Sequence, residues 1–332
     1  MLRLKYLFEK VSLAKECIEL YEYNKETLDD MMSFFRISSN AIYPFRAGEN
    51  AEKICFLRLS PAEEKSFEDV VTEVELINWL IENGFPAMRP VSMKDGEFAK
   101  QMHTEWGVYN VSCFEKVPGE SLENVNGTLE IAKGYGYTLG NLHALLKEYP
   151  HSENRRDHRA LLDEISCRIQ KYDAPETVKR ELLAVSKEIE QLPVLASDYG
   201  IVHYDFEPDN VFYDAETDSF SVIDFDDAIC CWYALDIVRA LDGLDEVVKD
   251  SDMDEAKFYF MEGYKSATDL TEEQQQTFAL MRRLVRLQEY AALLHVMSEP
   301  ILEMPEWMIG LTDKLKCKLH WLENMMELGK FE

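Results

Sequence analysis

The stretch from Ile201 to Asp227 constrains this chain more than any other part of it. It places a His, several Asp residues and an Asn in two short loops. Each loop follows or adjoins an apolar run, Tyr199 to Val202 for the first and Phe220 to Ile223 for the second. Short apolar runs of this kind are typical of buried strands. The pattern predicts a hairpin that carries acidic side chains in its loops, where functional residues often gather.

Length and charge limit the classes of protein to consider. The 332 residues are enough for one large or two ordinary domains with a sizeable core. The net charge of −28 argues against a nucleic-acid surface, which needs a basic face, and against binding to anionic lipid. A few local cations and backbone N–H groups still suffice to hold phosphates. A cationic substrate would suit the acidic field.

The seven Cys residues are irregularly spaced and form no C-x-x-C. This favours reduced thiols over a disulfide framework or a zinc site. The first ten residues lack the apolar core of a signal peptide. No apolar run approaches the roughly 18 residues that a membrane span needs. We therefore expect a cytoplasmic protein, and the sequence does not fix its oligomeric state.

Strand patterns dominate the first third of the chain. Ser60 and Glu63 have the spacing of a capping box with Pro61 at the first helical position, so we expect a helix from Ser60 to about Asn83. The other expected elements are a helix over 1–30, a hairpin over 32–47, a strand over 53–59 and short strands over 88–117 with a tight turn at 94–97.

Helical patterns dominate after Pro118-Gly119. Thr271 and Gln274 predict a second capping box. The sequence therefore predicts an α+β chain of two lobes, 1–117 and 118–332, with the acidic loops in the second lobe. The helices expected in the second lobe cover 128–149, 155–170, 175–191, 234–243, 254–267, 271–297 and 303–327.

The acidic loops have the residue types that phosphoryl transfer requires. Asp205 and Asn210 lie five apart, and Asp224 follows fourteen residues later. Transfer from ATP needs a carboxylate to orient and deprotonate the acceptor hydroxyl, and Mg²⁺ beside the phosphates. Carboxylate and amide oxygens suit Mg²⁺. A single Asp in a loop is usually a turn or cap residue, so the spacing of the set is what indicates function.

These motifs resemble the aminoglycoside phosphotransferase and choline kinase family of the protein-kinase-like superfamily, over about residues 30 to 300. His203, Asp205 and Asn210 match its H-x-D-x-x-x-x-N loop, and Asp224 opens its D-F-D motif after Ile. Asp236 matches an Asp on the next helix. The resemblance implies a two-lobe kinase-like fold with Asp205 as catalytic base and with Asn210 and Asp224 as Mg²⁺ ligands. It gives His203 and Asp236 structural roles.

The resemblance also implies that the first lobe binds ATP. Arg58 stands where the family has a phosphate-binding cation, and Glu73 stands where it has the acid that pairs with that cation. Glu75 is a competing partner. Taken without the resemblance, Arg58 could be a strand charge and Glu73 one more exposed acid of a helix.

Two further segments match nucleotide-binding parts of the family less closely. No G-x-G-x-x-G is present, and Ser39 and Asn40 occupy its place as hydrogen-bond donors. Without Gly, backbone conformations with positive φ are costlier. The segment before Pro118 resembles the hinge, where backbone groups of Glu115 and Val117 would meet adenine.

Acidic and aromatic residues of the second lobe are expected to line the acceptor pocket. Such a pocket would suit an amine or quaternary ammonium substrate through charge and cation–π contact. Alternatively, the aromatic residues belong to the core. The candidates are Tyr204, Glu207, Asp226, Asp227, Trp232, Glu289, Tyr290 and Trp307.

The resulting prediction is transfer of the ATP γ-phosphate, with Mg²⁺, to a hydroxyl of a small molecule. Aminoglycosides, choline, ethanolamine, homoserine and sugars are acceptors of the family, and the sequence does not choose among them. Two alternatives stay open. One is a phosphatase of the haloacid-dehalogenase type, because Asp224 and Asp226 form a D-x-D after an apolar run. The other is a kinase-like binding protein, because the phosphate loop lacks glycine.

Overall fold

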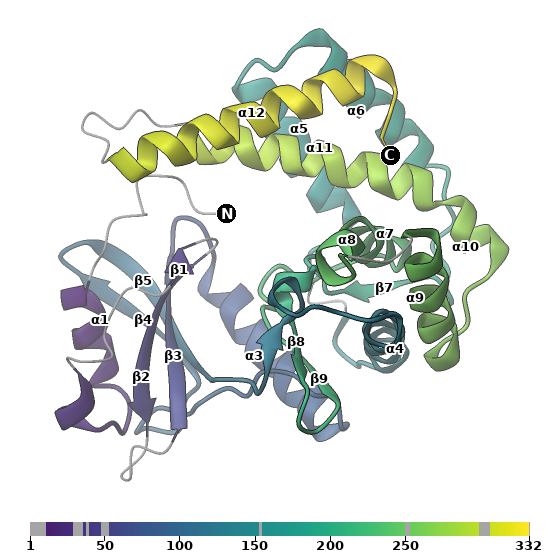
Figure 1. Cartoon of the computed structure of the whole chain (residues 1–332). Helices are drawn as coiled ribbons and strands as arrows, with labels where there is room; N and C mark the ends of the chain where they lie inside the picture. The colour runs from purple at the N-terminus through teal and green to yellow at the C-terminus, as the bar shows by residue number, and fades with distance from the viewer. Residues whose placement is uncertain are drawn as a thin grey trace.

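The structure is a computed structural model that describes residues 11–28, 36–37, 40–47, 53–152, 155–249, 253–298 and 306–331. Figure 1 shows a small lobe built on an antiparallel sheet and a larger, mostly helical lobe. The predicted α+β architecture of two lobes is confirmed. No helix in the described part of the chain is both long and apolar enough to cross a membrane.

The small lobe contains a five-stranded sheet of order β1-β2-β3-β5-β4, with every neighbouring pair antiparallel. Apolar side chains from the sheet pack with helix α1 into one core. Within the described residues 11–28, the helix predicted over 1–30 is present as α1 and ends early, because the chain turns at Leu20 and Tyr23 then bridges to Ala47 of β2. The elements are α1 (Val11–Ile18), a 3₁₀ turn (Lys25–Thr27), β1 (Arg36–Ile37), β2 (Ala41–Ala47), β3 (Lys53–Pro61), β4 (Ala99–Thr104) and β5 (Gly107–Glu115).

Helix α3 (Phe67–Glu82) begins later than the sequence predicted. Ser60 and Pro61 are the last residues of β3, where they pair with β5, so the predicted cap at Ser60 is wrong. The cap is Ser66, whose hydroxyl accepts the N–H of Asp69 at 3.1 Å, while the Asp69 carboxylate accepts the N–H of Ser66 at 3.3 Å. Pairing along the strand overrides the local capping signal six residues earlier.

The apolar face of α3 is packed into the large lobe. Ile77 and Leu80 share a core with Leu139 and Leu142 of α4 (Leu129–Leu146), whereas the sheet and α1 form a separate core. The division of the chain at residue 117 stays a prediction, since α3 precedes that point and packs beyond it. By packing, α3 is anchored to the large lobe.

The lobes are joined through Pro118 and Gly119. Gly119 has a φ of 80°, and a Cβ there would lie 2.2 Å from the carbonyl oxygen of Tyr213. Only glycine fits this approach. The chain then enters β6 (Glu120–Ser121), which pairs with β8 (Val211–Asp214), and β8 pairs in turn with β9 (Ser219–Val222).

The two apolar runs of the acidic stretch do not form the predicted hairpin with each other, because β7 (Tyr199–Val202) and β9 belong to different sheets. Strand β7 pairs with β10 (Ile229–Trp232) and leads into the first acidic loop. The capping box at Thr271 and Gln274 is confirmed, but the helix predicted over 271–297 breaks at Thr277. The helices after α4 are α5 (His158–Lys171), α6 (Glu176–Ile189), α7 (Ala234–Asp242), α8 (Leu244–Val247), α9 (Met253–Ala267), α10 (Glu272–Gln276), α11 (Phe278–Val296) and α12 (Glu306–Leu328), with 3₁₀ turns at Leu122–Asn124 and Pro208–Asn210.

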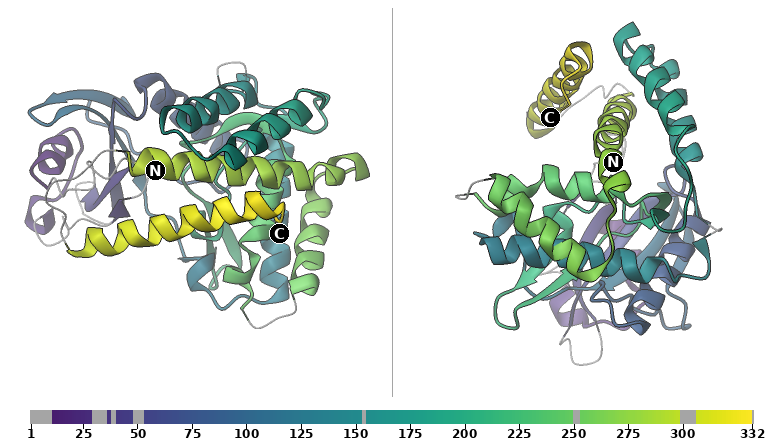
Figure 2. Two further views of the ribbon diagram at one scale, coloured as in Figure 1. Left: turned by 90° about the horizontal axis from the view of Figure 1, so that it is seen from above. Right: turned by 90° about the vertical axis from the view of Figure 1, so that its right-hand side faces the viewer.

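Four of these helices form a layer of their own. Helices α5, α6, α11 and α12 stand on one side of the rest of the large lobe, and α11 and α12 run side by side (Figure 2). They share a second core with β10 and α7. The layer faces the acidic loops and supplies the far wall of the cavities described below.

Candidate active site

The first acidic loop is shaped by Asp236 of α7, which is fully buried. Its carboxylate accepts the N–H of His203 at 2.7 Å and that of Tyr204 at 2.8 Å. Tyr204 has a φ of 77°, a left-handed conformation that is costly for a non-glycine residue. The two hydrogen bonds hold the backbone in this conformation. His143 adds a third contact, from Nε2, at 3.1 Å.

His203 ties the first loop to the second. Its Nε2 donates to the carbonyl of Ile223 at 2.9 Å, one residue before Asp224. Burial lowers the pKa of His203, which keeps the ring neutral. Asp224 has a φ of 66° and faces the cleft. These contacts are those that a structural role for His203 requires.

The loops bring together three of the predicted residues, Asp205, Asn210 and Asp224. Asn210 is buried, and its amide donates to the Asp205 carbonyl at 3.0 Å and to its carboxylate at 3.3 Å. The Asp205 side chain is 40% exposed because it faces a cavity. Its depth in the cleft, with Glu207 nearby, raises the pKa of Asp205 to about 7, although Arg239 opposes the shift.

Arg239 is a cation of this site that the sequence analysis missed. Its Nη1 lies 2.7 Å from Glu207 and 3.8 Å from Asp205. It also donates to Gln288 of α11 at 2.8 Å. The signal was available, because Arg239 follows Asp236 by three residues on one helix and so lies on the same side of it.

The small lobe contributes a buried ion pair. Arg58 Nη1 donates to Glu73 Oε1 at 2.9 Å and Nη2 pairs with the other oxygen. Arg58 is 3% exposed and Glu73 is 0% exposed. The expected pair is therefore present, and Glu75 is exposed. Arg58 also lies 3.7 Å from Asp224, across the lobes.

A second contact between the lobes centres on Asp226. Asn40 donates to its carboxylate at 2.8 Å, and Lys65 Nζ lies 3.0 Å from the same oxygen. Lys65 also bonds the Asp226 carbonyl and lies 3.4 Å from Asp227. Burial raises the pKa of Asp226, but Lys65, Arg58 and the Asn40 amide outweigh burial and hold that pKa well below its usual range. No sequence signal pointed to Lys65. Ser39 lies outside the described residues.

A cavity beside Arg58 has mainly apolar walls and reaches the hinge. The N–H of Glu115 is already bonded to the Arg89 carbonyl at 2.8 Å. Among the hydrogen bonds between described residues, none uses the N–H of Val117, which stays the predicted contact for adenine. We call this cavity the nucleotide cavity after its predicted ligand. Its lining residues are Asn40, Ile42, Phe56, Arg58, Met88, Phe114, Glu115, Lys116, Val117, Asn210, Phe212, Ile223 and Asp224.

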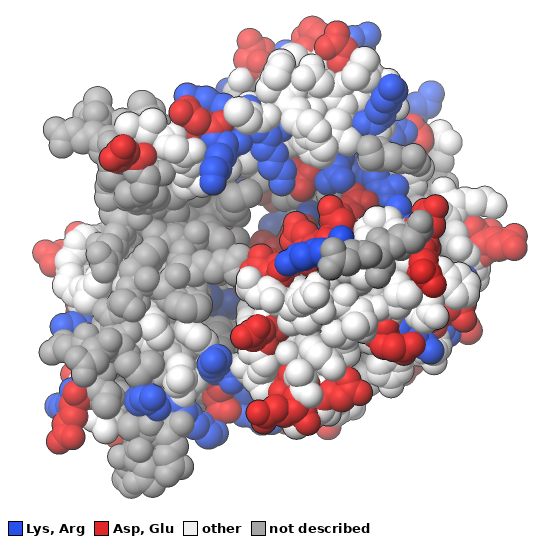
Figure 3. Space-filling view, viewed as in Figure 1, with Lys and Arg blue, Asp and Glu red and all other residues white. Residues whose placement is uncertain are grey.

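A second cavity meets the first at Asn210 and Asp224, which line both, and we call it the acceptor cavity after its predicted ligand. Figure 3 shows the surface hollowed between the upper helices and the lobe below, with basic side chains on the upper edge and acidic ones on the lower. The lining residues of the acceptor cavity are Tyr204, Asp205, Glu207, Asp209, Asn210, Asp224, Asp227, Arg239, Gln288, Glu289, Ala292, Leu293 and Lys318.

Two aromatic candidates for substrate contact are instead core residues. Trp232 is 2% exposed and donates from Nε1 to the Pro193 carbonyl at 3.1 Å, so that prediction is wrong. Tyr290 is 1% exposed and bonds Glu323. Both residues serve the second core of the large lobe. The side chain of Trp307 lies outside the described part of the chain.

The predicted magnesium ligands suit a site completed by phosphates. Among the described residues, no group of three or more His, Cys, Asp and Glu side chains is arranged to hold a metal ion. Mg²⁺ is commonly bound by one or two side chains together with waters and substrate phosphates. Burial and Asp226 raise the pKa of Asp224 well above its usual range. A divalent cation there would favour the ionised form, so Asn210 and Asp224 fit the ion.

A sheet lobe and a helical lobe that enclose loops of this kind define the protein-kinase-like class. The sequence profile of the phosphotransferase enzyme family matches residues 39–264. The chain belongs to this family. The predicted family, fold and enzyme class are thereby confirmed, and the haloacid-dehalogenase alternative is wrong because the fold is different.

Relatives and solved structures agree with this assignment. The chain is 23% identical to amicoumacin kinase of Bacillus subtilis over 237 residues, 70% of this chain and 68% of that protein. It is 24% identical to an uncharacterized protein of Synechocystis over 65% of this chain and 60% of that one. An amicoumacin kinase in complex with AMP-PNP, Ca²⁺ and Ami has a TM-score of 0.79 at 18% identity, covering 98% of this chain and 95% of that one. A microcompartment-associated aminopropanol kinase has a TM-score of 0.70 at 18% identity, covering 97% and 99%.

Proposed function

We propose that this protein transfers the γ-phosphoryl group of ATP to a hydroxyl of a small amine-bearing molecule. The observation that carries the proposal is the junction of the two cavities at Asn210 and Asp224. A phosphate chain in the nucleotide cavity would end where the acceptor cavity begins. The catalytic carboxylate, Asp205, lies on the acceptor side of that junction.

The residues divide the reaction between them. Asp205 accepts the proton of the acceptor hydroxyl, the oxygen forms a bond to the γ-phosphorus, and the bond from that phosphorus to the bridging oxygen breaks to release ADP. A base with a pKa near 7 is well matched to neutral pH. Arg58, fixed by Glu73, contacts the phosphates. Mg²⁺ on Asn210 and Asp224 would supply charge neutralisation of the phosphate oxygens.

The charge of the acceptor cavity favours an amine. Six carboxylates line it against two cations, Arg239 and Lys318. Glu207 is paired with Arg239, and Glu289 lies 3.1 Å from Arg286 and 3.3 Å from Lys318. This balance of charge attracts a cationic acceptor to the cavity. The solved relative named as an aminopropanol kinase is consistent with an amine-bearing alcohol as acceptor.

The test is a screen of amine-bearing alcohols, aminoglycosides and sugars with Mg²⁺ and ATP, measuring ADP release and the phosphorylated product by mass spectrometry. We expect turnover of at least one amine-bearing alcohol and its loss in Asp205→Asn. Thermal stabilisation by AMP-PNP with Mg²⁺ should persist in that variant. Stabilisation by nucleotide without turnover of any acceptor would favour the kinase-like binding protein instead.

A further inference from the structure

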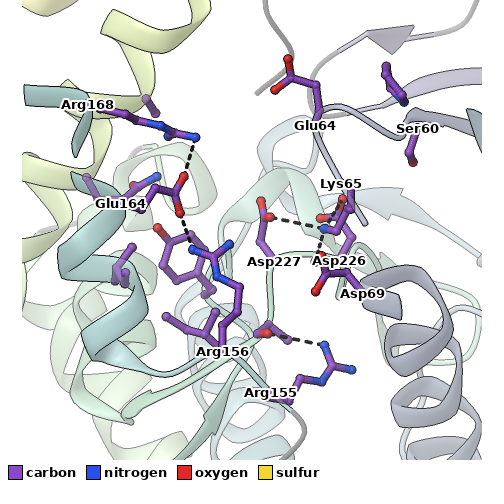
Figure 4. Close-up of a pocket in the computed structure, with 17 residues that line it drawn as sticks. Ser60, Glu64, Lys65, Asp69, Arg155, Arg156, Glu164, Arg168, Asp226 and Asp227 are labelled. Carbon is purple, nitrogen blue, oxygen red and sulfur yellow. Dashed lines mark hydrogen bonds and ion pairs between the residues drawn. The ribbon is translucent and has the colours of Figure 1, made fainter. Parts of the chain in front are cut away.

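A third cavity continues the acceptor cavity away from the nucleotide. Tyr204, Asp227 and Gln288 line both. Its other walls come from the segment between β3 and α3 and from α5 (Figure 4). A ligand whose hydroxyl reaches Asp205 can therefore extend past Asp227 toward α5. We call this third cavity the extension cavity.

The far wall of the extension cavity is basic. Arg156 and Arg168 both direct a guanidinium at Glu164, one to each carboxylate oxygen (Figure 4). Two cations thus share one anion. Both remain accessible, with 46% of the Arg156 side chain and 26% of the Arg168 side chain exposed. The other acids of the lining lie elsewhere in the cavity, so this group of two guanidinium groups and one carboxylate is a local excess of positive charge on its wall.

Arg155, the next basic residue, is engaged differently. It donates to the Thr72 carbonyl of α3 at 2.6 Å and to the Ala228 carbonyl at 3.4 Å. Its donors therefore tie α3 to the segment before β10. Arg156 and Arg168 face the cavity, and the single carboxylate of Glu164 balances only one of their two positive charges.

The near end of the extension cavity is acidic. Asp227 is 39% exposed and lies 3.4 Å from Lys65. Lys65 is closer to Asp226, at 3.0 Å from its carboxylate, so its charge is largely matched there. Asp227 is left as a carboxylate at the junction of the two cavities. Charge therefore changes sign along the extension cavity, from acidic at Asp227 to basic at Arg156 and Arg168.

We propose that the extension cavity is a subsite for an anionic group of the acceptor, a carboxylate bound by Arg156 and Arg168. The acceptor class is then an alcohol that carries both an amine and a carboxylate, with the amine at Asp227. Guanidinium groups bind carboxylates through paired, charge-assisted hydrogen bonds. A ligand carboxylate would balance the second guanidinium beside Glu164. This inference rests on the proposed phosphotransferase function and narrows its substrate.

The experiment compares acceptors that differ by one carboxylate. The pairs are 3-amino-1-propanol with homoserine, and homoserylglycinamide with homoserylglycine, which place the carboxylate at two distances from the hydroxyl. ADP release measures phosphorylation. Calorimetry in the presence of AMP-PNP and Mg²⁺ measures binding of each acceptor. We expect the carboxylate to lower KM by at least about tenfold in one pair, the effect of one hydrogen bond to a charged group.

Variants assign that preference to the basic wall. In Arg168→Gln and in Arg156→Gln/Arg168→Gln, the acid should lose its advantage while the neutral partner keeps its kcat and KM. Arg180→Gln is the matched control, because Arg180 is exposed on α6 and is not among the residues that line the cavity. If the double variant fails to fold, the single variant still reports.

The outcomes separate this inference from the function on which it rests. No turnover of any acceptor contradicts the proposed function. Turnover in which acid and neutral partner have equal KM in both pairs overturns the subsite but leaves the function standing. A preference for the acid that survives in Arg168→Gln and in the double variant also overturns it, because the carboxylate would then bind elsewhere.

Discussion

The nucleotide cavity and the acceptor cavity are neighbours, yet different kinds of groups line them. The nucleotide cavity has apolar walls such as Ile42 and Phe56, backbone groups at the hinge and one buried cation, Arg58. The acceptor cavity and its extension are lined by charged side chains from α5, α7 and α11. The proposed function therefore assigns recognition of the donor to shape and backbone groups, and recognition of the acceptor to charge. Substitutions in the acceptor cavity could therefore change the preferred acceptor without changing the nucleotide cavity.

The largest expected effect separates chemistry from donor binding. Asp205→Asn should lower kcat by about 10²- to 10⁴-fold, because the proton acceptor is lost. Affinity for AMP-PNP with Mg²⁺ should change little, since the apolar cavity is untouched. Rapid-mixing measurement of ADP formation and a thermal shift titration check the two parts. An equal loss of nucleotide affinity would show that the two cavities are not separable.

Next in size is the buried ion pair of the donor side. Glu73→Gln leaves the Arg58 charge without its bidentate partner, so the free energy of unfolding should fall by about 3–5 kcal/mol. Urea denaturation measures this loss. Glu75→Gln is the matched control, two residues away on the same helix and exposed, and it should change stability by less than about 0.5 kcal/mol. Similar losses in the two variants would mean that the pair is not special.

Lys65 lines neither the nucleotide cavity nor the acceptor cavity, but it pairs with Asp226, two residues after Asp224, which lines both. Its removal should therefore affect both cavities more mildly. Lys65→Met leaves Asp226 without its ion pair and lets the loop of Asp224 shift, and kcat should fall by about tenfold to a hundredfold. Lys65→Arg should recover part of the kcat that Lys65→Met loses. Lys100→Met, at an exposed pair with Asp95, is the control. A change in KM for the acceptor alone, with kcat intact, would place Lys65 on the acceptor side only.

The smallest expected effect is on the pH dependence of stability and comes from His143, which contacts Asp236 behind the first acidic loop. Burial lowers the pKa of His143 below 6.5, whereas in the unfolded chain it protonates near 6.5. Below that pH the unfolded state binds the extra proton, so stability falls as pH decreases. His143→Gln should make the loss between pH 7 and pH 5.5 smaller by up to about 1 kcal/mol. Parallel urea curves for both proteins at each pH test this, with His103→Gln on exposed β4 as reference.

The contrast between the cavities also explains what could be predicted from the sequence. Asp205, Asn210 and Asp224 are fixed by short loops, so their spacing predicted that they would meet. Arg58 and Glu73 meet because a strand is followed by a helix. Each of these sets depends on local order along the chain.

The features that could not be predicted depend on contacts between distant parts of the chain. Lys65 reaches Asp226 across 161 positions, and nothing near Lys65 indicates that partner. The strand through Ser60 depends on pairing with β5, which outweighs a correct local capping pattern. Trp232 was predicted to line the pocket because it is aromatic, but the layer of α5, α6 and α11 covers it. The basic wall of the extension cavity was missed because its members share no motif.

The anchoring of α3 has a consequence for control of the protein. In enzymes of this fold the corresponding helix carries the acid that pairs with the phosphate-binding cation, and regulation often acts by moving that helix. Here Ile77 and Leu80 pack α3 into the core of the large lobe, and Glu73 on the same helix pairs with Arg58. We therefore expect that movement of this helix does not switch the protein off. We expect its output to follow how much of it is made and how much acceptor is present.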